Sequence, residues 1–89
     1  MKNLIRVERA RLEMSQIELA EHIGVTRQTI YAIEKGKFTP SVILAFKLAK
    51  ALKVDINYLF TIEETDFINV LLKAHTIYFD RRKHPWNNA

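Results

Sequence analysis

The sequence predicts an all-α protein, with a compact bundle of four or five short helices followed by one amphipathic helix. Apolar residues recur at spacings of three and four along most of the chain, which is the helical period. Only two glycines and two prolines occur among 89 residues, and a turn-rich β fold would need more. The length leaves room for one domain core. We expect a domain at residues 1–61 and a helical extension at residues 62–89.

The composition excludes several classes of protein. The chain has no cysteine, so it has no disulfide framework, no zinc finger and no thiol chemistry. No apolar run approaches the roughly 18 residues of a membrane span, and charged residues follow Lys2 where a signal peptide would be apolar. These features are compatible with a cytoplasmic protein. The net charge of +4 is uneven, because residues 1–60 contain ten bases and six acids, while residues 61–89 contain four of each.

The first half of the chain contains three predicted helices. Helical spacing of Ile5, Arg9 and Leu12 predicts the first over residues 2–13. Ser15 followed by Glu18 forms a capping box that begins the second helix, and Gly24 suits its left-handed C-terminal turn. The third helix covers about residues 26–35.

A fourth helix is predicted after Pro40, over residues 41–52, and a short turn at residues 56–60 closes the core. In the third helix, Thr26 is the expected cap and Gly36 the expected stop. The apolar positions of the fourth helix form one stripe with three leucines beside it: Val42, Ala45, Phe46 and Ala49, with Leu44, Leu48 and Leu52.

The C-terminal segment is acidic at its start and then amphipathic. Acidic residues at 63–66 favour a helix N-terminus, and Pro85 forbids continuation of the helix. Its apolar side contains Phe67, Val70, Leu71, Ala74 and Tyr78. A single helix of this kind is not stable alone in water. It therefore dimerises, caps its own domain or binds a second protein, and the sequence leaves these alternatives open.

Residues 16–35 contain the pattern required for two helices that cross at about 90–120° through a short turn. Apolar side chains at Leu19, Ile23, Ile30 and Ile33 bury the inner angle, and small Ala20 permits close approach. Five segments carry a resemblance to a known family: Met14-Ser15-Gln16, Glu18-Leu19-Ala20-Glu21, Gly24-Val25-Thr26-Arg27-Gln28-Thr29-Ile30, Ile33-Glu34-Lys35-Gly36-Lys37 and Pro40-Ser41. Through these segments the chain resembles the Cro/phage-repressor (Xre-type) helix-turn-helix family.

This resemblance covers about residues 2–60 and implies a double-stranded DNA operator as the partner, bound by a homodimer. The third helix would lie in the major groove with its N-terminal residues at the base edges. Arg27, Gln28 and Tyr31 are the expected base-reading residues, since Arg pairs with guanine and Gln with adenine. The residues expected at the DNA backbone are Gln16, Thr26, Lys35 and Lys37, and Thr26 has a purely structural role as its alternative.

The same resemblance implies an ion pair between Arg9 and Glu34. Arg9 shares a helical face with apolar residues, where an unpaired charge would be costly, so we expect a partly buried salt bridge between the first and third helices. Two departures from the family pattern concern the first helix. Glu8 stands where many relatives have an apolar residue, and Glu13 stands where many have glycine.

No catalytic or metal-binding constellation is present in the sequence. His22, His75 and His84 have no metal-ligand spacing, and no phosphate-binding glycine loop or nucleophile elbow occurs. We therefore expect no enzymatic activity, no metal and no cofactor. The predicted function is a sequence-specific transcriptional regulator, a repressor in the first instance. The alternatives are an antitoxin-type protein whose C-terminal helix grips a partner, and a protein-binding module that has lost DNA binding.

Overall fold

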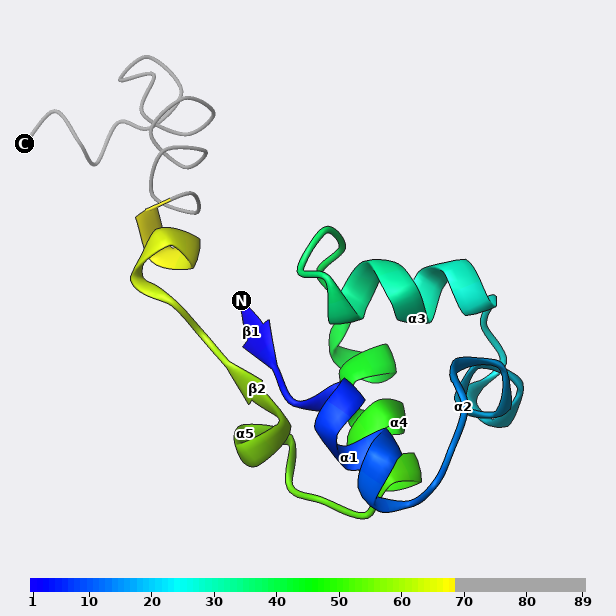
Figure 1. Cartoon of the computed structure of the whole chain (residues 1–89). Coiled ribbons are helices and arrows are strands. Elements are labelled where there is room, and N and C mark those ends of the chain that lie inside the picture. The colour runs from blue at the N-terminus through cyan, green and yellow to red at the C-terminus, as the bar shows by residue number, and fades with distance from the viewer. Residues whose placement is uncertain (69–89) are drawn as a thin grey trace, which may run out of the picture.

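The computed structural model describes residues 1–68, and this part of the chain is a small helical domain with a two-stranded sheet at one edge (Figure 1). Residues 64–68 are also helical. The predicted all-α class is confirmed. In chain order the elements are β1 (Lys2–Asn3), α1 (Ile5–Arg11), α2 (Gln16–Ile23), α3 (Arg27–Glu34), α4 (Val42–Leu52), α5 (Ile56–Leu59) and β2 (Phe60–Thr61).

Three helices begin at the capping residues that the sequence predicts. Ser15 accepts a hydrogen bond from the backbone N–H of Glu18, and the Glu18 side chain accepts one from the N–H of Ser15. Thr26 caps α3 and Ser41 caps α4 in the same way, each through its side-chain oxygen. Gly24 ends α2 with φ 79°, a left-handed conformation that glycine adopts without a steric penalty.

The core lies between α4 and the helices around it. α4 packs against α1, α2 and α5, and α2 also packs against α3. Burying one large apolar side chain stabilises the fold by about 1.5–3 kcal/mol. The fully buried side chains come from all five helices: Ile5, Leu19, Ile30, Ile33, Leu48, Leu52 and Leu59.

The apolar stripe predicted on α4 divides between core and surface. Ala45 and Ala49 are buried, as is Leu48. Val42 is 71% exposed and Phe46 is 56% exposed, because both lie at the edge of the helical arc that faces the other helices. Their exposure leaves an apolar surface at the start of α4 that the spacing of residues did not distinguish from the core.

The small sheet differs from the prediction for the start of the chain. β1 and β2 are antiparallel, with Lys2 opposite Thr61 and Asn3 opposite Phe60, and the N–H of Leu4 donates to the carbonyl of Leu59 at 2.9 Å. The predicted first helix therefore begins at Ile5 rather than at residue 2. Residues 2 and 3 are extended because their backbone groups pair with a segment nearly sixty residues away.

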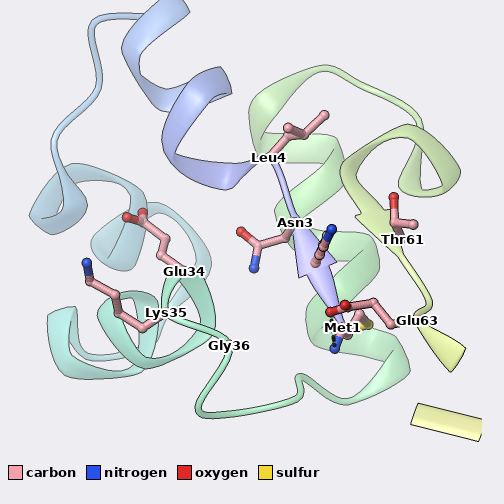
Figure 2. A pocket seen from close by; sticks show the side chains of 9 residues that line it. Met1, Asn3, Leu4, Glu34, Lys35, Gly36, Thr61 and Glu63 are labelled. Carbon is pink, nitrogen blue, oxygen red and sulfur yellow. Dashed lines mark ion pairs between the residues drawn. The ribbon is translucent and has the colours of Figure 1, made fainter. Parts of the chain in front are cut away.

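The N-terminal ammonium of Met1 is held by two acidic side chains beyond β2. It donates to Oδ1 of Asp66 at 2.9 Å. It also lies 3.4 Å from Oε1 of Glu63, and Figure 2 shows these two residues close together. The hydrogen bond to Asp66 raises the pKa of the amino group above its ordinary value of 8.0. That bond, with one from the backbone of Glu63, lowers the pKa of Asp66 below 3.8.

The two departures noted in the first helix have visible consequences. Glu8 is buried, and its carboxylate pairs with Nε of Arg11 at 3.1 Å. Nη2 of Arg11 also donates to the carbonyl of Leu52 at 3.2 Å, which caps the C-terminal end of α4. Glu13 has φ 54°, so this residue occupies the left-handed conformation that a glycine would adopt more readily.

The predicted C-terminal helix is only partly within the described residues. Phe67 belongs to residues 64–68 and is exposed. Val70, Leu71, Ala74 and Tyr78 lie outside the described residues. Among the described helices, none is both long and apolar enough to cross a bilayer.

Candidate nucleic-acid interface

The α2–turn–α3 unit is positioned by apolar contacts on its inner side. Leu19, Ala20 and Ile23 of α2 are buried, as are Ile30 and Ile33 of α3. The opposite side of α3 is exposed, and the unit is therefore a rigid support for the side chains on that side. Arg27, Gln28 and Tyr31 are exposed there, on the helix that Figure 1 shows along one edge of the bundle.

The C-cap residue of α3, Lys35, places a basic side chain close to Tyr31. Nζ of Lys35 lies 5.7 Å from the centroid of the Tyr31 ring, within the range of a cation–π contact. This contact places the ammonium near the exposed side of α3. Lys37, the other predicted backbone contact, is exposed in the loop that follows.

Arg9 and Glu34 form a two-point ion pair between α1 and α3. Nε of Arg9 lies 2.7 Å from Oε2 of Glu34, and Nη2 lies 3.1 Å from Oε1. The side chains are 14% and 6% exposed, respectively. A third donor, Nη1 of Arg9, bonds the carbonyl of Met14 at 2.9 Å. The pair therefore connects α1, the loop before α2, and the end of α3.

Gln16 joins this ion pair, which the sequence did not indicate. Its Nε2 donates to Oε1 of Glu34 at 3.1 Å, so the first residue of α2 is attached to the last residue of α3. The amide nitrogen has a second N–H, which this bond leaves free. Thr26 is engaged differently, because Oγ1 accepts the backbone N–H of Thr29 at 3.2 Å and lies 2.9 Å from the Thr29 hydroxyl.

A cavity of about 390 Å³ lies where α1, α2 and α3 meet, and it brings predicted residues together with one that was missed. The missed residue is Arg6, which stands one helical turn before Arg9 on α1. That three-residue spacing was the available signal. The cavity is lined by Arg6, Arg9, Gln16, Arg27, Tyr31, Glu34 and Lys35. Gln28, Thr26 and Lys37 do not line it.

Comparison with known proteins identifies this arrangement. The family model described as helix-turn-helix matches residues 5–59. The chain belongs to the Cro/phage-repressor (Xre-type) helix-turn-helix family. Proteins of this family are DNA-binding transcriptional regulators, and the matched residues include the whole of α1 to α5.

Several relatives are HTH-type transcriptional regulators that are shorter than this chain. An uncharacterized HTH-type transcriptional regulator of Methanothermobacter thermautotrophicus is 51% identical over 65 residues, which are 72% of this chain and 94% of the relative. The regulator YgzD of Bacillus subtilis is 48% identical over 64 residues, covering 72% and 97% of the two chains. A regulator of Methanocaldococcus jannaschii is 48% identical over 66 residues, covering 74% and 100%. About a quarter of this chain therefore has no counterpart in the last relative.

Proposed function

We propose that this Xre-type protein is a repressor that binds a specific double-stranded DNA operator with α3 in the major groove. The observation that carries the proposal is the exposed side of α3, whose polar side chains stand on a helix held rigidly by the core and by the Arg9–Glu34 pair. A helix of this kind fits the width of the major groove. Occupation of an operator would exclude other proteins from the same DNA, which supports repression.

Base recognition in this proposal falls on three exposed side chains of α3, namely Arg27, Gln28 and Tyr31, of which Arg27 would pair with a guanine edge. Gln28 would donate to and accept from an adenine edge, and Tyr31 would contact the adjacent base. Lys35 and Lys37 would neutralise phosphates, and Gln16 would donate its free N–H to the DNA backbone. Thr26, which caps α3, would also lie against the DNA backbone. The mechanism is binding alone, with no chemical step.

A selection of bound DNA sequences tests this assignment. Purified wild-type protein, Gln28→Ala and Tyr31→Ala are each used to enrich duplexes from a random pool. We expect each variant to lose about 1–3 kcal/mol of binding to the wild-type site and to relax the preference at one base position. The matched control is Gln16→Ala, which should weaken binding to all duplexes alike. Unchanged base preference in both α3 variants would refute the placement of α3.

We also propose that the protein binds DNA as a homodimer, because two half-sites about 34 Å apart require two copies of α3. The surface that supports this proposal is an apolar patch, here called the α4 patch, which begins directly after Lys37. It consists of Phe38, Val42, Ile43 and Phe46, all of which are exposed. The patch adjoins the basic loop after α3. A second copy of the protein that packs against the patch would therefore be able to bind the same DNA duplex.

Relatives of the chain favour the α4 patch over the C-terminal segment as the dimer surface. The full length of the Methanocaldococcus jannaschii regulator matches 74% of this chain, and the other quarter of this chain has no counterpart in that regulator. A dimer surface that both proteins share would therefore lie in the matched part. Sedimentation of Phe46→Lys and Leu71→Lys distinguishes the two surfaces. We expect Phe46→Lys to be monomeric and Leu71→Lys to remain dimeric, and the reverse result would assign the interface to the C-terminal segment.

The antitoxin-type alternative has its own supporting observation. Ile62, Phe67 and Ile68 are exposed at the start of the C-terminal segment, where they offer an apolar surface to a second protein. Co-purification of one defined partner that is lost on Phe67→Asp, with DNA binding unchanged, would support this function beside DNA binding.

A further inference from the structure

Residues 1–4, here called the N-terminal strap, contact three parts of the domain that are far apart in the sequence. One edge of the strap pairs with β2 and with the end of α5. A side chain of the strap bonds the last turn of α3, and its amino group bonds a residue beyond β2. Figure 2 shows the strap with the loop at Gly36 on one side and Thr61 and Glu63 on the other. The strap therefore joins the end of α3 to the start of the C-terminal segment.

The side-chain amide of Asn3 connects the beginning of α1 to the end of α3. Its Nδ2 donates to the carbonyl of Ile33 at 2.8 Å, and its Oδ1 accepts the N–H of Ile5 at 3.2 Å. The carbonyl of Ile33 is among the last four of α3, which have no acceptor role inside the helix, and the N–H of Gly36 also reaches it at 3.0 Å. Asn3 is thus a cap of α3 that another segment supplies, and the last turn of α3 depends on the position of the strap.

The basic loop after α3, residues 35–38, borders both the strap and open space. Gly36 has φ 73°, and a Cβ on it would lie 3.8 Å from the carbonyl oxygen of Met1. A cavity of about 550 Å³ is lined by the strap and by the turn at Lys35 and Gly36 (Figure 2). Because the loop has open space on this side, the hydrogen bond from the strap to the last turn of α3 limits its movement. The positions of Lys35 and Lys37 therefore follow that of the strap.

The carboxylate of Asp66 holds the other end of the strap. Its Oδ1 accepts from the Met1 ammonium at 2.9 Å, and its Oδ2 accepts the N–H of Glu63 at 2.8 Å. The side chains of Asp66 and Glu63 are 30% and 38% exposed, so water screens both ion pairs with the ammonium. Screened contacts of this kind open more readily than a buried core. This end of the strap can therefore be released while the domain stays folded.

We propose that the N-terminal strap is a conformational link through which docking or release of residues 62–68 changes the position of the basic loop. In the docked state, Asp66 holds the Met1 ammonium and Asn3 caps α3. In the released state, the strap turns away from α3 and the carbonyl of Ile33 loses the bond from Asn3. The proposal rests on the DNA-binding function proposed above, because the loop carries lysines expected at DNA phosphates. The domain would bind these phosphates most tightly while residues 62–68 are docked.

Hydrogen exchange of the free protein, followed by NMR, tests the link without DNA. The perturbation is Asp66→Asn, which removes the charge that pairs with the Met1 ammonium. The matched control is Glu64→Gln, because Glu64 is exposed and forms no ion pair within residues 1–68. The N–H of Lys37, which bonds the carbonyl of Ala32 at 2.9 Å, reports on the loop. Its exchange should be about two- to fivefold faster in Asp66→Asn, the range for loss of a screened ion pair, and unchanged in Glu64→Gln.

Two further samples act on the two ends of the strap. Acetylation of the Met1 α-amino group removes its charge and should give the same increase as Asp66→Asn, with no added effect when both changes are combined. Asn3→Ala removes the bond to α3 and should accelerate exchange at Lys37 about tenfold. The N–H of Leu48, in the core of α4, reports general unfolding. A change at Leu48 as large as that at Lys37 would show that the whole domain is destabilised, and it would overturn the link.

DNA binding shows whether the link has a regulatory effect. Asp66→Asn and Glu64→Gln each remove one negative charge, so the long-range attraction to DNA rises equally in both. We expect Asp66→Asn to bind the selected duplex about two- to fivefold more weakly than Glu64→Gln, and the difference to shrink when Lys37→Gln is added to each. Since coupling is reciprocal, bound DNA should slow exchange of the Glu63 N–H in the wild-type protein by a similar factor. Equal affinities of the two variants would overturn the proposal.

The exchange experiment separates this proposal from the function on which it rests. If wild-type protein enriches no duplex while Lys37 responds to Asp66→Asn, the DNA-binding function fails and the link between the two segments stands. If wild-type protein binds its selected duplex and exchange at Lys37 is the same in Asp66→Asn and Glu64→Gln, the function stands and the link is wrong.

Discussion

Removal of the Glu34 carboxylate should destabilise the domain far more than removal of a surface carboxylate. In Glu34→Ala, three hydrogen bonds of 2.7–3.1 Å are lost, and the guanidinium of Arg9 keeps only its bond to Met14. Arg9 is 14% exposed, so it is left with little solvent to replace its partner.

The magnitude follows from burial and from the cavity beside the pair. Removing one partner of a buried ion pair costs about 3–5 kcal/mol, whereas an exposed pair contributes under about 1 kcal/mol. Since water in the adjacent cavity can solvate one edge of Arg9, we expect a loss of about 2–4 kcal/mol. For a domain of this size each kcal/mol lowers the melting temperature by about 4–8 °C.

The assay is urea and thermal denaturation followed by far-ultraviolet circular dichroism. Glu21→Ala is the matched control, because Glu21 is exposed on α2, and surface substitutions usually change stability by less than about 0.5 kcal/mol. In a double-mutant cycle, Arg9→Ala combined with Glu34→Ala should cost clearly less than the sum of the single losses. A loss for Glu34→Ala of under about 1 kcal/mol would show that the pair behaves as an exposed one and refute the reasoning.

Three other changes follow from local geometry. Glu13→Gly should raise the free energy of unfolding by about 0.5–1 kcal/mol in urea titrations, because φ is 54° there and glycine avoids the left-handed penalty; Glu13→Ala should give no such gain. Ser15→Ala should lower it by about 1 kcal/mol through loss of the capping box, and Ser15→Asp should restore most of the loss. The pairing of the Met1 ammonium with Asp66 should stabilise the fold fully between pH 3.8 and 8.0. This contribution should be lost as the pH rises through the raised pKa of the amino group. It should also be lost as the pH falls through the lowered pKa of Asp66. Asp66→Asn should lower the pKa of the Met1 amino group, measured by NMR titration, and an unchanged value would exclude the contact.

Local signals in the sequence were sufficient for most helices of the domain. Ser15, Thr26 and Ser41 cap the helices that they were expected to cap, because a cap depends on residues three positions apart. The sheet was missed for the opposite reason. Each strand has two residues, which is too short for a period-two pattern, and the pairing joins segments that only the finished fold brings together.

Side-chain environments were harder to predict than helices. Glu8 was recognised as unusual, and its burial is explained by Arg11 one turn later, a pairing that was visible in the spacing. The exposure of Phe46 was not visible, because helical period alone does not say which edge of an apolar arc meets a neighbour. The cavity that includes Arg6 combines three helices, so no stretch of sequence contains it.

The pairing of β1 with β2 has a consequence for how the gene can change. Opposed residues in an antiparallel pair lie about 4.5–5.5 Å apart, so the chain enters and leaves the domain at one corner, at Lys2 and Thr61. A domain with adjacent ends can be inserted into another protein or extended at either end without stretching its own core. The 23 residues that have no match in the 66-residue relative can therefore change without stretching that core. Recombination can exchange such residues while the helix-turn-helix domain at residues 5–59 stays the same.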